Sequence, residues 1–125
     1  MFYKVDNSGI LYIMRFWLDD RVIYKIGVTK RKPEERLMDI LLSFYKVYRY
    51  VPRCDIKRFT TTDNVYAKES IFHKCLKAYS FSSDKRFSGA TELFCGIDEE
   101  ILLYLYDRCL KGQLGGVVEK FDEVL

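Results

Sequence analysis

Two polar side chains, Glu69 and His73, lie four residues apart in a segment with helical spacing, so they share one face of a helix. Phe72 and Leu76 fall on the same face, which is otherwise apolar. A carboxylate on such a face is costly unless it is paired, bound to a metal ion or open to a cleft. Glu69 is thus the acid most suited to metal binding or catalysis. The alternative is a boundary residue that turns into water or meets Lys68 or a distant arginine.

A second group of chemically useful residues, Tyr24, Gly27 and Arg36, meets where a strand leads into a helix. The alternation of residues 22–26 has the two-residue period of a strand, and Gly27 permits a close approach that a side chain would block. Pro33 suits the first turn of the following helix, where its missing N–H costs nothing. Arg36 falls in the early turns of that helix and can reach back over the end of the strand.

Basic charge is concentrated around this corner. Residues 1–62 hold 13 Lys and Arg against 7 Asp and Glu, a net of +6, whereas residues 63–125 hold 8 against 11, a net of −3. Such asymmetry fits a polyanion partner, and it also fits an ordinary solvated surface. Lys30, Arg31 and Lys32 at the corner are candidate phosphate contacts, with a solvated turn as the alternative.

Hydrophobic periodicity and turn residues predict the elements that position these groups. The first half is expected to form a strand at 10–17, a strand at 21–26 after an Asp19-Asp20 turn, a helix at 33–48 and a strand at 53–59. The second half is expected to form a helix at 64–79 capped by residues 60–63, a short strand or extended segment at 91–95, a helix after the cap Asp98, and a strand or helix from Val117. The first two strands form an antiparallel hairpin. The sequence therefore predicts an α+β fold with a small three-stranded antiparallel sheet flanked by about three helices.

Composition narrows the class of protein. The 125 residues are expected to form a single domain over 1–125, with a core at 9–98 and a C-terminal helix and tail at 98–125. The four cysteines form no C-x-x-C pair and there is one histidine, which excludes a Cys/His zinc site of ordinary design. No apolar run approaches membrane-spanning length, and no signal peptide opens the chain. We therefore expect a soluble cytoplasmic protein with free thiols and no membrane partner.

Several short motifs run through most of the chain in a recognisable order. They are Gly9-Ile10-Leu11-Tyr12-Ile13, Tyr24-Lys25-Ile26-Gly27 with Thr29, Arg36, Glu69 with His73, and Arg86, Gly89, Thr91-Glu92 and Phe94. Over residues 9–98 they resemble the GIY-YIG nuclease superfamily, in a short branch common in bacteriophages and bacteria. The first motif has an extra Leu11, and Lys25 takes the usual tyrosine place in the second. Because a one-residue shift turns a side chain to the other sheet face, Tyr12 is the firmer functional tyrosine, and either Tyr24 or Lys25 faces the site.

This resemblance implies a metal-dependent endonuclease that hydrolyses phosphodiester bonds in DNA with one divalent ion, Mg²⁺ or Mn²⁺. Glu69 would hold the metal, Arg36 would brace the phosphate, and Tyr12 would orient or deprotonate the attacking water. A base role for a tyrosine requires neighbouring cations that lower its pKa. His73 is either an alternative base or a structural helix residue. The catalytic candidates are Tyr12, Tyr24, Arg36, Glu69 and His73, and the substrate-binding candidates are Lys25, Gly27, Lys30, Arg31, Lys32 and Arg86.

Two other function classes stay open on the same scaffold. One is a catalytically inactive nucleic-acid-binding module, and the other is a phage or host protein-interaction factor. The sequence shows no zinc finger and no helix-turn-helix signature that would add recognition of a DNA sequence. DNA is the expected partner, with a homo-oligomer or a specificity partner as further expectations, in the cytoplasm of a bacterium or a phage-infected host.

Overall fold

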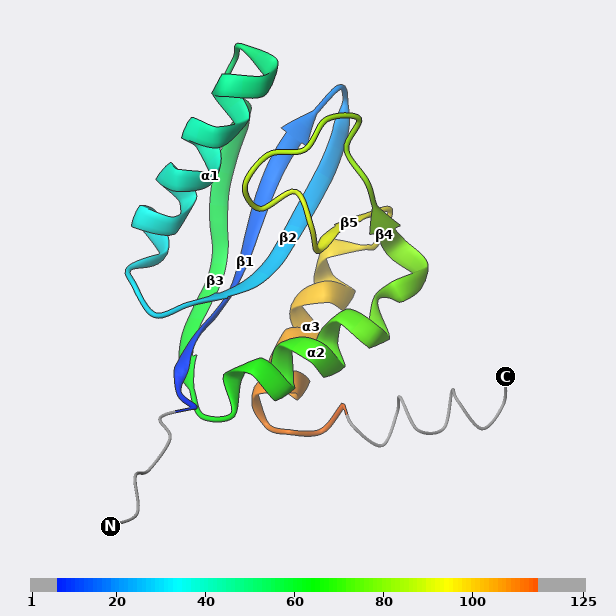
Figure 1. Cartoon of the computed structure of the whole chain (residues 1–125). Helices are drawn as coiled ribbons and strands as arrows, with labels where there is room; N and C mark the ends of the chain where they lie inside the picture. Colours follow the sequence, from blue (N-terminus) through cyan, green and yellow to red (C-terminus); the bar gives the residue numbers. More distant parts are fainter. Residues whose placement is uncertain (1–6, 115–125) are drawn as a thin grey trace.

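The computed structural model describes residues 7–114, which form a sheet with helices on both of its faces (Figure 1). The elements are β1 (Gly9–Leu18), β2 (Arg21–Thr29), α1 (Pro33–Tyr48), β3 (Arg53–Thr62), α2 (Val65–Cys75), a 3₁₀ turn (Lys77–Tyr79), β4 (Ser80–Phe81), β5 (Leu93–Cys95) and α3 (Glu99–Leu110). The predicted α+β class is confirmed. The expected strand or helix from Val117 lies outside the described residues.

The sheet is antiparallel and has the strand order β3-β1-β2-β5-β4. The predicted hairpin is present, because β1 and β2 pair along their whole length from Ile10↔Thr29 to Leu18↔Arg21. Its turn residues Asp19 and Asp20 have positive φ angles of 48° and 65°. Two successive left-handed residues match the right-handed twist of the flanking strands, so this short connection keeps the strands in register.

The prediction of a three-stranded sheet is wrong, because the sheet has five strands. The additional strands lie at one edge, where β4 has two residues and β5 has three. Strands this short are too brief to leave a two-residue alternation in the sequence. The expected cap at residues 60–63 is also misplaced: β3 runs to Thr62, and Asn64 precedes α2 without a side-chain capping hydrogen bond.

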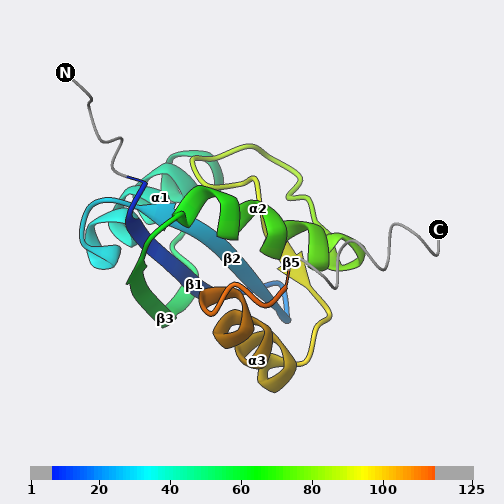
Figure 2. The same cartoon turned by 90° about the horizontal axis from the view of Figure 1, so that it is seen from below.

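Helix α1 covers one face of the sheet, and its bounds match the predicted 33–48. The core on this side is formed by the even-numbered side chains of β1, Tyr12, Met14 and Phe16, packed against Ile40 of α1. Viewed along the strands, α1 and α3 lie on opposite sides of the sheet (Figure 2). The side chains of one strand point alternately to the two faces, so β1 contributes to two separate cores.

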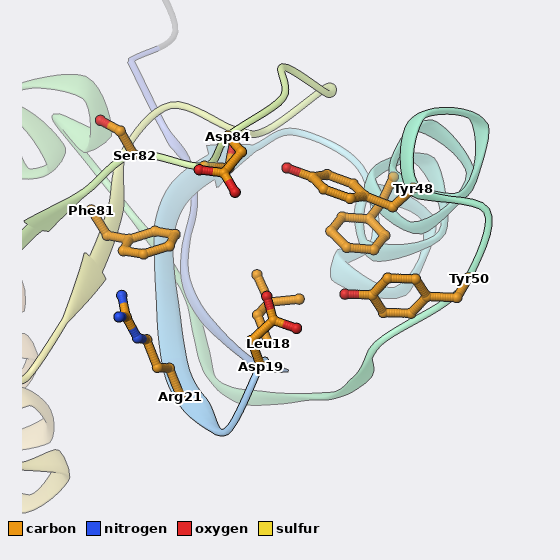
Figure 3. Close-up of a pocket in the computed structure, with 10 residues that line it drawn as sticks. Leu18, Asp19, Arg21, Tyr48, Tyr50, Phe81, Ser82 and Asp84 are labelled. Carbon is orange, nitrogen blue, oxygen red and sulfur yellow. The ribbon is translucent and has the colours of Figure 1, made fainter.

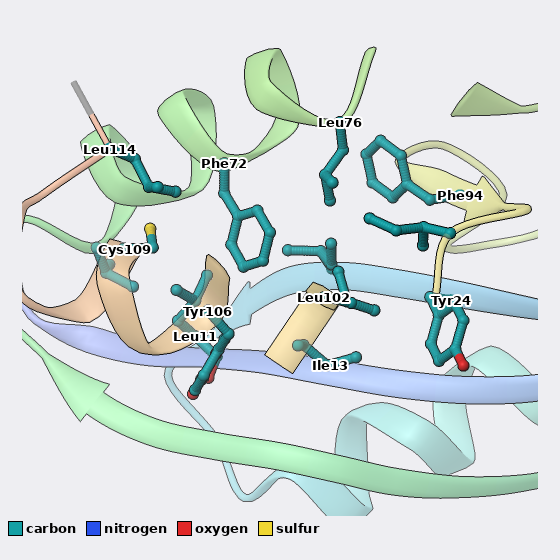
Figure 4. Close-up of a cluster of buried hydrophobic side chains, with 13 residues drawn as sticks. Leu11, Ile13, Tyr24, Phe72, Leu76, Phe94, Leu102, Tyr106, Cys109 and Leu114 are labelled. Carbon is teal, nitrogen blue, oxygen red and sulfur yellow. The ribbon is translucent and has the colours of Figure 1, made fainter. Parts of the chain in front are cut away.

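The second core lies between the sheet, α2 and α3 (Figure 4). Leu11 and Ile13 of β1 meet Phe72 of α2 and Leu102 of α3 there, and all four are fully buried. Tyr106 brings a hydroxyl into this core and donates it to the carbonyl oxygen of Leu11 at 2.7 Å. Burial of each such side chain contributes about 1.5–3 kcal/mol, which fixes α2 against the sheet.

The short length of β5 leaves part of β2 available to helix α2. Pairing between β2 and β5 covers residues 23–25 of β2. The next residue, Ile26, donates its N–H to the carbonyl of Glu92 at 3.4 Å, and its own carbonyl accepts a hydrogen bond from His73 of α2 at 2.9 Å. Helix α2 therefore lies along the edge of β2 beyond β5. Within the described residues, no helix is long and apolar enough to cross a membrane.

Candidate active site

Tyr12 lies at the centre of the candidate site, on the α1 side of the sheet. It is 1% exposed, and it sits opposite Gly27 in the pairing of β1 with β2. A Cβ atom at Gly27 would lie 2.4 Å from the Tyr12 hydroxyl oxygen, a distance that real structures do not tolerate. The tyrosine ring therefore lies across the bare backbone of Gly27, which accounts for the requirement for glycine here.

Arg36 reaches the Tyr12 hydroxyl from the second turn of α1. Pro33 begins that helix immediately after the turn from β2, so Arg36 extends back toward the sheet. Burial is the largest effect on the phenol and raises the pKa of Tyr12, while a hydrogen bond and the charge of Arg36 lower it. Burial prevails, so Tyr12 stays protonated near neutral pH, and the lowering by Arg36 is too small to give the depressed pKa that a base role would require.

Glu69 approaches the same place from α2. The pKa of Glu69 is raised to about 7, chiefly by burial and also by the charge of Glu92, against an opposing effect of Lys25. Glu69 also acts electrostatically on Tyr12, so the carboxylate and the phenol share one neighbourhood. Within the described residues, Glu69 forms no ion pair and no hydrogen bond through its side chain. It is a half-buried acid whose charge a bound cation would neutralise. Its position on an apolar helix face predicted such an uncompensated carboxylate.

Glu69, His73 and Glu92 form a group of possible metal ligands. Each offers one ligand atom, and these atoms all lie within 4.8 Å of one another. The Nε2 atom of His73 contacts the carbonyl oxygen of Ile26, and a carbonyl only accepts, so Nε2 carries the hydrogen. In the neutral ring Nδ1 is then the free acceptor. A histidine oriented in this way by a backbone carbonyl is the usual arrangement for a metal ligand.

Lys25 lies beneath these carboxylates and is 2% exposed. Its ammonium donates to the carbonyl of Thr91 at 3.1 Å and lies 3.6 Å from a carboxylate oxygen of Glu92. Burial lowers the pKa of Lys25, and the charge of Glu92 opposes that effect. Lys25 thus holds the segment that carries Glu92, and its buried ammonium does not project outward to a bound substrate.

Glu92 itself has a positive φ angle of 65°, in the left-handed region that glycine favours. Non-glycine residues in this region are uncommon and persist where the surroundings hold them. Two contacts stabilise this backbone conformation. The Lys25 ammonium lies near the Glu92 carboxylate, and the N–H of Ile26 donates to the Glu92 carbonyl at 3.4 Å. Glu92 is not among the metal ligands that the sequence predicts, because neither its backbone angle nor its contact with β2 is visible in the residue pattern.

Tyr24 lies on the opposite face of the sheet from Tyr12. Its hydroxyl donates to a carboxylate oxygen of Glu99 on α3 at 3.0 Å, and it belongs to the core that α2 and α3 cover. Burial, followed by the hydrogen bond to Glu99, raises the pKa of Tyr24 to about 12. The structure therefore places Lys25, and not Tyr24, on the side of Tyr12, so Tyr24 does not join the other candidates.

The basic corner between β2 and α1 is exposed at Lys30, Arg31 and Lys32. Arg31 pairs with Asp39 of α1, and its backbone N–H donates to the Thr29 hydroxyl at 3.1 Å. The corner therefore has a local structural role in addition to its positive charge. Arg86 is also exposed, in the long segment between β4 and β5. These side chains are not part of the Glu69 cluster.

A family model described as the T5orf172 domain matches residues 9–110, which is most of the chain. No curated protein and no solved structure matches the chain. The assignment to the GIY-YIG nuclease superfamily is wrong, because the matching family is a different one. This family is phage-related and is compatible with a DNA-binding or nuclease-like domain, and it assigns no specific reaction. The chain belongs to the T5orf172 domain family.

Proposed function

We propose that this domain hydrolyses phosphodiester bonds in DNA with the help of one divalent metal ion. The main support for the proposal is that the possible metal ligands lie near the Tyr12–Arg36 pair at one edge of the sheet. These ligands are Glu69, His73 and Glu92. A cation site beside an arginine is suited to a phosphate, which needs its charge neutralised from more than one side. The T5orf172 family membership is compatible with this reaction class.

The donor set fits a divalent cation. Two carboxylates and one imidazole lie within 4.8 Å of one another, and Glu69 forms no competing ion pair among the described residues. Carboxylates suit Mg²⁺ and Mn²⁺, and the imidazole favours Mn²⁺ of the two. When bound, such an ion supplies electrostatic stabilisation of charge on a phosphate oxygen. Glu69 is the principal ligand in this proposal because no protein cation already neutralises it.

Arg36 binds and orients the phosphate. Its only hydrogen bond to another described residue besides its interaction with Tyr12 is a long one of 3.4 Å to the hydroxyl of Ser88, so its guanidinium is available for a ligand. Arginine can make two parallel hydrogen bonds to a phosphate, which fixes orientation as well as charge. The Tyr12 hydroxyl remains protonated on the floor of the site: its oxygen accepts the hydrogen bond from Arg36, and its O–H can donate to the attacking water.

The proton of the attacking water needs an acceptor, and the site offers His73 or a carboxylate. If the free Nδ1 atom of His73 binds the metal, the ring cannot also accept that proton. A carboxylate that holds a metal ion loses basicity, so Glu69, the principal ligand, is not the acceptor. We therefore assign proton acceptance to Glu92, the exposed carboxylate of this cluster, and Tyr12 is excluded because its pKa is raised.

Cleavage of supercoiled plasmid in Mg²⁺ or Mn²⁺ tests the proposal, with wild type compared with Glu69→Ala and Arg36→Ala. We expect nicking by wild type and a loss of about 10²–10³ in rate for Arg36→Ala. Glu100→Ala is the matched control, because Glu100 is an exposed carboxylate on α3 at the other face of the sheet. It should cleave as wild type does.

Two outcomes would overturn the proposal in different ways. If wild type fails to cut supercoiled, linear, branched and single-stranded DNA in either metal, the enzyme assignment is wrong. A protein that still retards DNA in low salt would then be a catalytically inactive binding module. If cutting survives both Glu69→Ala and Arg36→Ala, the enzyme assignment stands and the site is elsewhere.

A further inference from the structure

A second cavity, of about 310 Å³, lies at the other end of the α1 side of the sheet (Figure 3). It is bounded by the β1–β2 turn, the end of α1 and the segment that follows β4. Tyr48 and Tyr50 form one wall and face Phe81 across the opening. A cavity of this volume is at the small end of ligand sites, so it suits a single ring system better than a large ligand.

The aromatic wall is held in place before any ligand arrives. Tyr48 stacks on Phe44 of α1 with ring centroids 4.4 Å apart, and Tyr50 packs edge-on against Phe44 at 5.2 Å. The backbone N–H of Lys85 donates to the Tyr48 hydroxyl at 2.9 Å, and that hydroxyl donates to the Lys85 carbonyl at 3.3 Å. A preformed wall avoids the entropy cost of ordering aromatic side chains upon binding.

The charged groups of the cavity are two carboxylates and one guanidinium. The carboxylates of Asp19 and Asp84 point toward the opening, and Arg21 is the one basic residue in the lining (Figure 3). Among residues 7–114, neither carboxylate forms an ion pair or accepts a side-chain hydrogen bond. Two carboxylates repel a phosphate and accept hydrogen bonds, so a planar ring with N–H donors on its edge fits between the aromatic walls.

The nucleobases of DNA have these features. Adenine, cytosine and guanine each carry an amino group, and a carboxylate is a recognised acceptor for the amino group of cytosine. Single-stranded bases stack on aromatic side chains and present their pairing edge to polar groups. Thymine has no amino group, so carboxylates favour it least. The sugar and phosphate would remain outside, next to Arg21 and the exposed Lys85.

The cavity and the candidate active site lie at two ends of the same face of the sheet, and α1 and the segment between β4 and β5 pack over the core that separates them. Leu18 at the cavity and Tyr12 at the active site both belong to the α1 side, six residues apart on β1, or about 20 Å at the rise of a strand. The segment between β4 and β5 lines both places, with Asp84 at the cavity and Glu92 at the active site. The exposed Arg86 lies between them in sequence. A stacked strand covers about 20 Å with about six nucleotides.

We propose that this cavity binds an unpaired, amino-bearing nucleobase of the DNA strand, about six nucleotides from the phosphate that is cleaved. The assignment of the base to the cleaved strand rests on the proposed function, whereas binding of the base does not. The cavity thereby selects substrates that have a single-stranded or unpaired position at this distance.

The test is an NMR titration of the full chain, without metal, with deoxyguanosine, deoxycytidine, deoxyadenosine and thymidine. We expect resonances of Tyr50 and Asp84 to shift with the three amino-bearing nucleosides, and thymidine to bind at least about fivefold more weakly. Tyr50→Ala and Asp84→Asn should each weaken binding by roughly fivefold or more, because both side chains are exposed and their loss spares the core. Tyr66→Ala, an exposed tyrosine on α2, is the control and should leave binding unchanged.

Three results would overturn the inference. No shift with any nucleoside would leave the cavity without this ligand, and equal binding of thymidine would remove the role of the carboxylates. Shifts of the same resonances with arginine amide, but not with nucleosides, would assign the cavity to a basic side chain of a partner protein. Nucleoside binding by a protein that cleaves no DNA would overturn the nuclease and leave the base site in place.

Discussion

Glu69→Gln is expected to abolish metal-dependent cleavage and at the same time to stabilise the protein above neutral pH. Glutamine keeps the size and shape of the side chain and removes its charge. Burial and the nearby Glu92 raise the pKa of Glu69 to about 7, from an ordinary value of 4.5 in the unfolded chain. The folded state therefore favours the protonated acid, and the ionised form is the one that the fold destabilises.

The sign of the pH dependence follows from that difference. The favourable contribution of protonated Glu69 is complete below about pH 4.5 and is lost as the pH rises through about 7. The two pKa values differ by an amount equivalent to at most about 3 kcal/mol. Because Glu69 is only half buried, solvent screening reduces this to about 1–2 kcal/mol. The free energy of unfolding of Glu69→Gln should exceed that of wild type by this amount at pH 8 and match it at pH 5.

Thermal unfolding at pH 5 and pH 8, without metal, measures the effect. A gain of about 1–2 kcal/mol corresponds to a rise in Tm of roughly 3–10 °C for a chain of this size. Added Mg²⁺ or Mn²⁺ should raise the Tm of wild type at pH 8 and not that of Glu69→Gln, since a ligand stabilises only the form that binds it. Glu100→Gln, at an exposed position on α3, should show neither effect.

The opposite result is a Glu69→Gln variant whose stability relative to wild type is the same at pH 8 as at pH 5. Such a result would mean that the Glu69 carboxylate is paired or fully hydrated in the folded protein, and the basis for metal binding would be removed. A metal-dependent rise in Tm that persisted in Glu69→Gln would place the ion elsewhere.

Three further substitutions separate the roles of neighbouring residues. Gly27→Ala places a Cβ 2.4 Å from the Tyr12 hydroxyl, so we expect a loss of about 1–3 kcal/mol in unfolding free energy and reduced cleavage. A variant as stable as wild type would contradict the close packing of Tyr12 on Gly27. Tyr24→Phe removes the hydrogen bond to α3, and it should cost about 0.5–1.5 kcal/mol while cleavage per folded molecule is unchanged; a large loss of rate would place Tyr24 in the site. Lys25→Met removes a charge that lowers the pKa of Glu69, so the pH profile of the cleavage rate should move to higher pH. A profile that does not move would argue against Glu69 as the titrating group.

The local elements were largely predictable from the sequence, because their signals are local. Helix α1 begins at Pro33 and ends at Tyr48 as its periodicity indicates, and Asp98 caps α3 by accepting a hydrogen bond from the N–H of Ile101 at 3.2 Å. The size of the sheet was not predictable. Strands β4 and β5 are defined by pairing with a distant segment of the chain, and two or three residues carry no period of their own.

The site was predictable where a residue conflicts with its surroundings. Glu69 on an apolar helix face is such a conflict, and the structure shows the raised pKa that goes with it. The face occupied by Tyr24 depends on the register of β1 with β2, in which Tyr12 opposes Gly27 and Arg15 opposes Tyr24. Sequence alone does not fix that register.

The position of Glu92 in the site and the aromatic cavity could not be predicted from the sequence for another reason. Both depend on the path of the long segment between β4 and β5, which carries Asp84 to one end of the sheet and Glu92 to the other. The positive φ angle of Glu92 belongs to that path and not to the residue type. A polar segment rich in serine and charged residues does not indicate such a path.

The central claim is that Glu69 anchors a divalent ion for cleavage of DNA, and one rate comparison tests it most directly. The measurement is the rate constant for nicking of supercoiled plasmid at saturating Mn²⁺, with enzyme in excess, for wild type and Glu69→Ala. The account predicts metal-dependent nicking by wild type and a rate at least about 100-fold lower for the variant. Equal rates for the two proteins would contradict it.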